Sequence, residues 1–165
     1  MATTSSQTAT VTLPADEQIL ITREFDAPRH LVFEAWTTPE LVKRWWNAKR
    51  GEMTVCEIDL RVGGAWRYAM VTPDGTEVAF HGEYREIVPN ERIVSTEVYE
   101  GAPAGTPEEG TLNTATFAEQ DGRTTLTVLV QAPSKTVRDA IVDSGMEAGM
   151  QDAMDLLEEV AVSLR

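Results

Sequence analysis

Three side chains in strand-like stretches have the chemistry needed to move a proton. His81 and Glu83 stand two residues apart in AFHGEYRE, so a regular strand would place both on one face. Glu97, in STEVY, would complete a polar spot in which imidazole and carboxylate groups exchange a proton near neutral pH. The simpler interpretation, which we favour, is a solvated outer face. Gly82 leaves the register open, because a glycine inside a strand is typical of a bulge or bend.

Aromatic and methionine side chains indicate a different kind of site. Trp66, Tyr68 and Met70 alternate in AWRYAMV, so they share one face of a strand. Helical spacing near the C-terminus brings three further methionines together, namely Met146, Met150 and Met154. Aromatic rings and methionines suit an adaptable apolar pocket between strand and helix. The alternative is that the same side chains fill a closed core.

Two glycines interrupt this helical stripe. Gly145 and Gly149 lie four residues apart, so a continuous helix would place them on one face. Each should cost a helix interior about 1 kcal/mol relative to alanine. The missing side chains would allow close packing against a tryptophan, which we favour, or leave room for a ligand along the helix.

Other catalytic chemistry has no recognisable pattern in this chain. There is no clustered Cys/His arrangement for zinc and no glycine-rich phosphate loop, so we expect neither a metal nor a cofactor. No serine occupies a G-x-S-x-G turn. Cys56 is the single cysteine, which excludes an intramolecular disulfide, and we interpret it as a small apolar residue of a strand.

Charge and hydropathy narrow the set of partners. A formal net charge of -13 would repel a phosphate backbone, so we expect no nucleic-acid partner. No stretch approaches the roughly 18 apolar residues that span a bilayer, and the N-terminus lacks a secretory pattern. We therefore expect no membrane insertion and a cytoplasmic location. No sequence feature decides the oligomeric state, and a homodimer stays an open alternative.

The periodicity predicts the elements that would position these residues. A period of two predicts a strand at 18–25 and about six antiparallel strands between residues 53 and 132. Two short helices, beginning near Asp26 and Thr38, stand between the first strand and the others. A helical pattern then runs from 136 to 164.

The predicted elements define one α+β domain. An antiparallel sheet must bury one face, and only the last helix is long enough to cover it. We expect a curved antiparallel sheet wrapped around the long C-terminal helix, with the two short helices closing one end. Residues 1–17 are expected to form a flexible tail before a single domain over 18–165, and the loop at 101–110 could gate a pocket.

Four segments of the chain resemble one known family. They are FDAPRHLVFEAWTTPELVKRWW, VGGAWRYAM, PDGTEVAFHGEYREIVPNERIV and SGMEAGM. These segments are similar to bacterial proteins that resemble the activator of the heat shock protein 90 ATPase, in the START-like or SRPBCC superfamily. The resemblance covers about residues 18–164 and implies the helix-grip fold. It also implies an apolar ligand between sheet and helix, as in lipid carriers, hormone receptors and polyketide cyclases of the superfamily. The eukaryotic co-chaperone uses a further N-terminal domain, so its role is not carried over by name.

The function that we expect is binding of an apolar, aromatic or lipid-like small molecule under the last helix. The expected pocket residues are Trp36, Trp66, Tyr68, Met70, Phe80, His81, Glu97, Met146, Gly149, Met150 and Met154. One alternative is a cyclase- or hydrolase-like enzyme that uses polar pocket groups. Another is a chaperone-related interaction module of the stress response, with a chaperone as partner.

Overall fold

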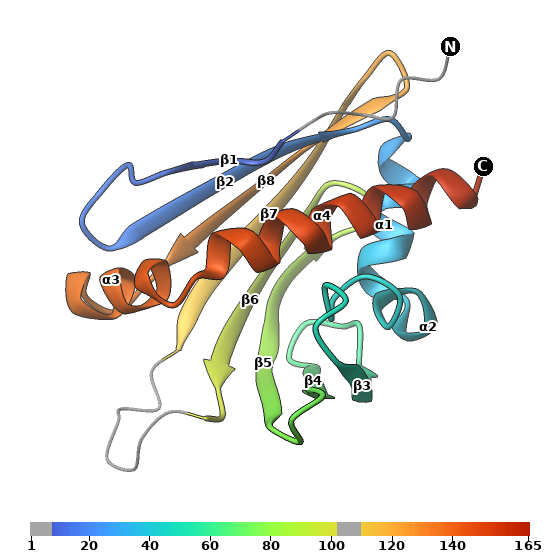
Figure 1. Cartoon of the computed structure of the whole chain (residues 1–165). Coiled ribbons are helices and arrows are strands. Elements are labelled where there is room, and N and C mark those ends of the chain that lie inside the picture. Colours follow the sequence, from blue (N-terminus) through green and yellow to red (C-terminus); the bar gives the residue numbers. More distant parts are fainter. Residues whose placement is uncertain (1–7, 102–109) are drawn as a thin grey trace.

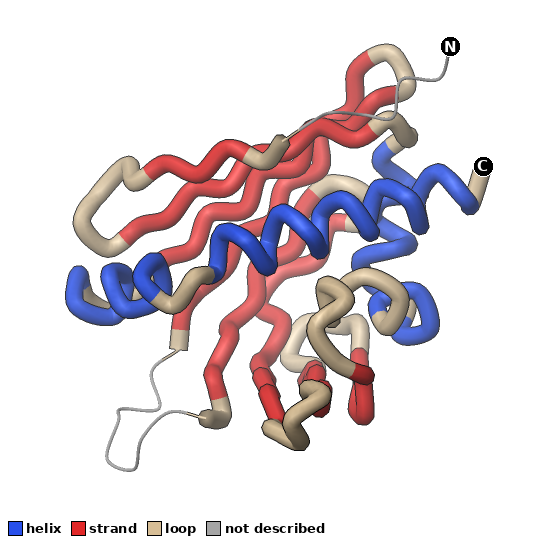
Figure 2. The backbone as a smooth tube through the Cα atoms, in the orientation of Figure 1, coloured by secondary structure: helices blue, strands red, loops and turns tan. Residues whose placement is uncertain are grey.

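The protein folds as one antiparallel sheet with its helices on a single face (Figures 1 and 2). The computed structural model describes residues 8–101 and 110–165. The elements in chain order are β1 (Thr10–Thr12), β2 (Gln18–Phe25), α1 (Arg29–Thr37), α2 (Pro39–Val42), β3 (Glu52–Ile58), β4 (Ala65–Val71), β5 (Glu77–Val88), β6 (Arg92–Tyr99), β7 (Thr111–Gln120), β8 (Arg123–Gln131), α3 (Lys135–Asp143) and α4 (Met146–Ser163). The sheet order is β1-β2-β8-β7-β6-β5-β4-β3, and each neighbouring pair is antiparallel.

Helix α4 crosses the hollow side of the curved sheet, and α1 and α2 lie near its C-terminal end (Figure 1). We call the sheet face that looks toward α4 the inner face. Alternation along β8 buries Thr124, Leu126 and Val128 on this face, and the same alternation along β2 buries Ile19 and Ile21. The predicted α+β helix-grip architecture is therefore confirmed.

The N-terminal segment joins the sheet earlier than predicted. Thr10–Thr12 forms β1 and pairs with Leu20–Thr22 of β2. The side chain of Gln151 on α4 bonds the backbone of Ala9 in both directions, at 2.9 Å and 2.8 Å. The prediction of a flexible tail up to residue 17 is wrong for this stretch, because backbone pairing satisfies its polar groups. Residues 1–7 of that tail lie outside the described residues, as do 102–109 of the proposed gating loop.

The predicted long C-terminal helix is two helices. Helix α3 ends at Asp143, and Gly145 precedes α4 with a φ of 82°. This left-handed conformation suits glycine, which has no Cβ to clash with the backbone. Gly145 is therefore a break between helices, and the prediction of a glycine pair on one helix face is wrong.

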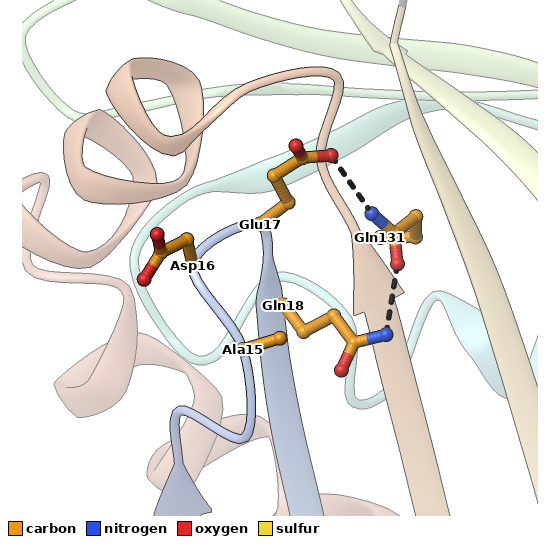
Figure 3. A pocket seen from close by; sticks show the side chains of 5 residues that line it. All are labelled: Ala15, Asp16, Glu17, Gln18 and Gln131. Atoms are coloured by element: carbon orange, nitrogen blue, oxygen red, sulfur yellow. Dashed lines mark hydrogen bonds between the residues drawn. The ribbon is translucent and has the colours of Figure 1, made fainter.

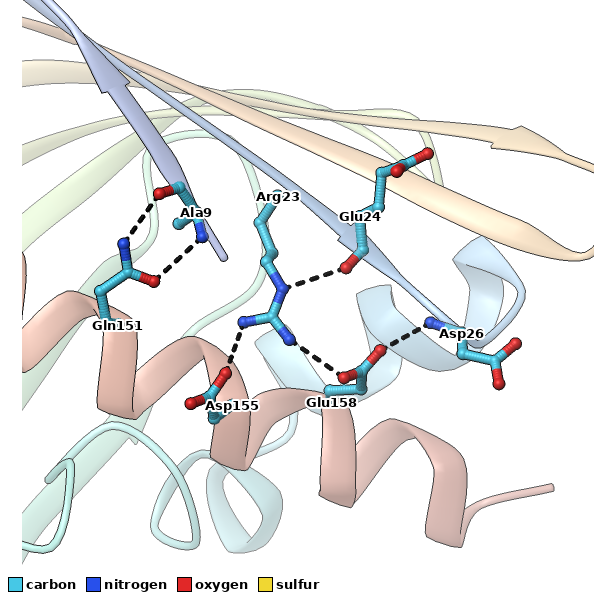
Figure 4. A network of polar contacts seen from close by, with 7 residues as sticks. All are labelled: Ala9, Arg23, Glu24, Asp26, Gln151, Asp155 and Glu158. Atoms are coloured by element: carbon cyan, nitrogen blue, oxygen red, sulfur yellow. Dashed lines mark hydrogen bonds and ion pairs between the residues drawn. The ribbon is translucent and has the colours of Figure 1, made fainter. Parts of the chain in front are cut away.

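A buried arginine fixes α4 to the sheet (Figure 4). Arg23 continues the inner-face alternation of β2 and is 1% exposed. Its guanidinium donates to Asp155 at 2.8 Å and to Glu158 at 3.0 Å, while the second carboxylate oxygen of Glu158 accepts from the backbone of Asp26 at 2.8 Å. This network, which we call the Arg23 clamp, positions the middle of α4 over β2.

The register of β5 sets which side chains face inward. The irregularity between β5 and β6 falls between Tyr84 and Glu86, not at Gly82 as the sequence suggested. Before it, Phe80 and Tyr84 face inward, and after it Ile87 does so, opposite Ile93. The extra residue lets one strand keep apolar side chains inside on both sides of the bulge.

Candidate functional site

An aromatic wall covers the inner face of the strands from β4 to β6. The rings of Trp66 and Tyr68 lie 4.8 Å apart, and those of Phe80 and Tyr99 lie 5.1 Å apart. Trp46, in the turn that follows α2, contacts the wall at 5.4 Å from Tyr68 and 5.7 Å from Phe80. Tyr68, Phe80 and Trp46 are each partly buried, so this wall keeps some accessible surface.

The adjacent residues Trp45 and Trp46 lie in different environments. Helix α2 ends at Val42, so Trp45 and Trp46 lie in turns and not in the predicted second helix. Trp45 is 5% exposed, stacks on Trp36 at 5.2 Å and donates its indole N–H to the carbonyl of Ala35 at 2.9 Å. Trp45 thus belongs to the core, while Trp46 faces the aromatic wall.

Three polar side chains of β6 and β7 share the inner face beside the aromatic wall. Glu97 stands directly opposite Thr111 in the β6–β7 register, and Ser95 stands opposite Asn113. Asn113 donates its amide N–H to Glu97 at 3.4 Å. Thr111 Oγ1 and Asn113 Oδ1 are buried and have no hydrogen-bond partner among the described residues. We call Glu97, Thr111 and Asn113 the polar cluster.

The electrostatics of the polar cluster follow from its burial. Burial raises the pKa of Glu97, and the hydrogen bond from Asn113 opposes this rise. Burial is also the largest cause that raises the pKa of Tyr68, and the charge of Glu97 adds to it. The neighbouring Tyr84 and Cys56 contribute more to the raised pKa of Tyr68 than Glu97 does.

Gly82 leaves the space in which the indole of Trp66 reaches the backbone of β6. Gly82 pairs with Trp66 across β4 and β5. A Cβ at Gly82 would lie 2.6 Å from the indole nitrogen of Trp66, which donates to the Thr96 carbonyl at 3.2 Å. Glycine at this position thus lets the indole N–H of Trp66 reach the carbonyl of Thr96, next to Glu97 in the polar cluster.

His81 does not belong to this site. It alternates with inward-facing Phe80, lies on the outer face with its side chain 49% exposed, and meets Glu100 at 3.0 Å. Glu100 also accepts two bonds from Arg67 at 2.9 Å, and these bonds, followed by that of His81, lower its pKa to about 2. The prediction that His81 lines the pocket is wrong, because β5 is regular at this point and its alternation places His81 on the face opposite to Phe80. Glu83 is likewise exposed, so neither residue can exchange a proton with Glu97.

The residues of α4 that were predicted to line the pocket differ in their burial. Met146 and Met150 are partly buried and pack against the core, whereas Met154 is 5% exposed and belongs to it. A Cβ on Gly149 would find only Arg50 Nε, at 3.7 Å, so this glycine packs against neither a tryptophan nor the aromatic wall. Met70 shares its face with Tyr68 but stands at the far end of β4 and is not part of the packed cluster.

Cys56 lies beside the aromatic wall, opposite Tyr68 in the β3–β4 register. Burial is the main cause that raises the pKa of its thiol to about 11. The thiol is therefore protonated at neutral pH, as expected for a cysteine that packs as an apolar residue.

A shallow hollow of about 310 Å³ opens elsewhere, at the start of β2 (Figure 3). It is lined by Ala15, Asp16, Glu17, Gln18 and Gln131. Gln131 accepts from Gln18 at 2.9 Å and donates to Glu17 at 3.3 Å, so its polar groups are engaged with one another. The hollow shares no residue with the predicted pocket, and a cavity under α4 stays a prediction.

Sequence reasoning missed Thr111 and Asn113. The signal was present in TLNTATF, where Thr111, Asn113, Ala115 and Phe117 alternate, so two polar residues continue an apolar face. The contact of Trp46 with the aromatic wall depends on the turn after α2, which the sequence does not reveal.

A family model identifies the chain. The model for "Activator of Hsp90 ATPase homolog 1-like protein" matches residues 26–161. The chain belongs to this family. No curated protein matches the chain. Among the described residues, no helix has the length and apolar character needed to cross a membrane.

Solved structures of bacterial proteins share the fold. A protein from Rhodobacter sphaeroides is 24% identical with a TM-score of 0.85, and the match covers 95% of this chain and 99% of that one. A protein from Mycobacterium smegmatis is 26% identical with a TM-score of 0.80, covering 92% and 95%. An AHSA1-like protein from Aeromonas hydrophila is 21% identical with a TM-score of 0.63, covering 88% and 93%. The fold of this chain therefore recurs in several bacterial proteins.

Proposed function

We propose that this protein binds a small molecule with an apolar or aromatic body on the inner face, between the sheet and α4. The body of the ligand would lie against Trp46 and against the aromatic wall, whose rings are those of Trp66, Tyr68, Phe80 and Tyr99. Its polar end would reach the polar cluster. Domains of this superfamily commonly bind small ligands, which agrees with the proposal.

The observation that carries the proposal is the pair of unpartnered atoms in the polar cluster. Thr111 is 8% exposed, yet its hydroxyl has no partner, and Asn113 Oδ1 has none either. A buried polar group without a partner costs about 1–3 kcal/mol, so native proteins seldom keep two side by side without a use. A ligand that bonds both atoms would recover this cost on binding.

The surroundings favour an apolar body for that ligand. Trp46, Tyr68 and Phe80 on the sheet side, and Met146 and Met150 on α4, are partly buried and pack against the same core. Methionine side chains adapt to different shapes, and aromatic rings provide large contact areas at low entropy cost. Burial of the ligand body would contribute roughly 25 cal/mol per Å² before the costs of association.

The two alternative functions have less support. The enzyme alternative relied on His81 and Glu83 acting with Glu97, and the sheet separates these groups onto opposite faces. The chaperone alternative follows from the family description alone. A protein that binds no small molecule in the experiment below would favour the chaperone alternative.

A fluorescence titration with N-phenyl-1-naphthylamine, a neutral apolar probe, tests the proposal. We expect saturable enhancement with the wild type and loss of it in Met150→Glu, which places a charge on the partly buried face of α4. Ala148→Glu adds the same charge at an exposed position of α4 and should bind normally. Equal binding by both variants, or no saturable binding by the wild type, would contradict the proposal.

A further inference from the structure

We infer that the polar cluster recognises a protonated amine, so that the ligand is an amphipathic ammonium compound with an aromatic or alkyl body. This inference rests on the proposed function and adds the chemical class of the ligand's polar end. It is carried by the donor and acceptor inventory of the cluster, by its charge and by the rings beside it.

The polar cluster is rich in acceptors. Glu97 contributes two carboxylate oxygens, and the one amide N–H donor identified there runs from Asn113 to Glu97. That bond leaves Asn113 Oδ1 as an unpartnered acceptor, and Thr111 Oγ1, which can also accept, is unpartnered beside it. An ammonium group brings three N–H donors and no acceptor, which matches three neighbouring oxygens. A carboxylate or phosphate could accept from the second Asn113 N–H and from the Thr111 hydroxyl, but it would lie beside the Glu97 carboxylate, which repels an anion.

The charge of the cluster has no internal counterpart. Within 8–101 and 110–165, the ion pairs formed by arginine, lysine and histidine involve other carboxylates, and none reaches Glu97. Glu97 is instead surrounded by Thr111 and Asn113 on β7 and by the aromatic wall on β4 and β5. A buried carboxylate is stabilised by an opposite charge at hydrogen-bond distance. A cationic ligand supplies this charge.

The aromatic wall suits the same group. Trp66 donates its indole N–H to the carbonyl of Thr96, next to Glu97, and the ring of Tyr68 lies 4.8 Å from that of Trp66. Indole and phenol rings attract cations through their faces, and aromatic rings are used to recognise ammonium ligands. A hydrocarbon body on the wall with an ammonium group on the polar cluster therefore satisfies both parts of the site at once.

Three matched probes test this inference by isothermal titration calorimetry with the full chain at pH 7: 3-phenylpropylamine, 3-phenyl-1-propanol and 4-phenylbutyrate. They share a phenylalkyl body and differ in the polar end. We expect the amine to bind roughly 10- to 100-fold more tightly than the alcohol, as for a charge-assisted hydrogen bond, and the carboxylate to bind weakest.

Two variants connect the preference to the cluster. Glu97→Gln keeps the shape and removes the charge, and Thr111→Val removes the unpartnered hydroxyl. Each should lower the affinity for the amine about tenfold or more and leave that for the alcohol within about threefold. Glu83→Gln, which removes the same charge from the outer face of the adjacent strand, should change neither affinity. Both test variants should fold, because each relieves a buried group that lacks full compensation.

The outcomes separate this inference from the proposed function. If the alcohol binds the wild type as tightly as the amine, the inference is overturned while the apolar site stands. The same holds if the amine keeps its advantage in Glu97→Gln. If none of the three probes binds and the fluorescent probe also fails, both proposals are overturned.

Discussion

Removing the hydroxyl of Thr111 should make the protein more stable. Thr111 Oγ1 is buried without a partner, and such a group costs about 1–3 kcal/mol in the folded state. Thr111→Val replaces the hydroxyl with a methyl group of similar size. We expect the free energy of unfolding to rise by about 1 kcal/mol, which corresponds to roughly 2–4 °C in Tm for a chain of this size.

Thr124 offers a matched control in the neighbouring strand. It is fully buried, and its hydroxyl donates to the carbonyl of Ala27 at 2.7 Å. Thr124→Val should therefore lower the free energy of unfolding by about 1–3 kcal/mol, because a buried carbonyl loses its partner. Urea unfolding monitored by tryptophan fluorescence measures both variants. If Thr111→Val destabilises the protein as Thr124→Val does, then the Thr111 hydroxyl has a hydrogen-bond partner. The polar cluster would then offer no unpartnered hydroxyl to a ligand.

Three further predictions follow from other parts of the fold. Arg23→Met leaves the buried carboxylate of Glu158 unpaired and should cost about 3–5 kcal/mol in urea unfolding, most of it recovered by adding Glu158→Leu; a cost below about 1 kcal/mol would refute the clamp. Because the pKa of Glu100 is lowered to about 2 from 4.5, its stabilising effect is present above pH 4.5 and is lost as the pH falls toward 2. Glu100→Gln should flatten that part of the stability profile, and an unchanged profile would contradict it. Gly149→Ala should raise Tm, since its Cβ meets only Arg50 at 3.7 Å, whereas Gly145→Ala should lower it because of the φ of 82°; the reverse order would refute both assignments.

The sequence of elements along the chain and the inner face could be predicted in large part from the sequence. The period of two in AWRYAMV placed Trp66 and Tyr68 on one face, and the structure brings them together beside Phe80. The break at Gly145 was missed because the apolar stripe continues through it, and periodicity does not reveal a left-handed residue. The short β1 was missed because three residues of Thr and Val carry too weak a pattern.

The composition of the candidate site was harder to predict, because it depends on which residues from distant segments become neighbours. His81 and Glu97 both look like proton carriers in sequence, yet the β5–β6 register places them on opposite faces. Arg23 follows Ile19 and Ile21 in the buried alternation, a pattern that predicts a buried charge without revealing its partners on α4. The unpartnered atoms of the polar cluster depend on which residues of β6 and β7 become neighbours, and the sequence does not show this.

Methyl NMR of methionine tests the location of the binding site most directly. With 13C-methyl methionine in the protein and N-phenyl-1-naphthylamine as the probe, we expect saturable shifts at Met146 and Met150, which are partly buried on α4 and pack against the core. The methyl of Met53, on the edge strand β3, should move least. Saturable shifts confined to Met53, or none at Met146 and Met150 on a sample that binds the probe, would contradict a site between the sheet and α4.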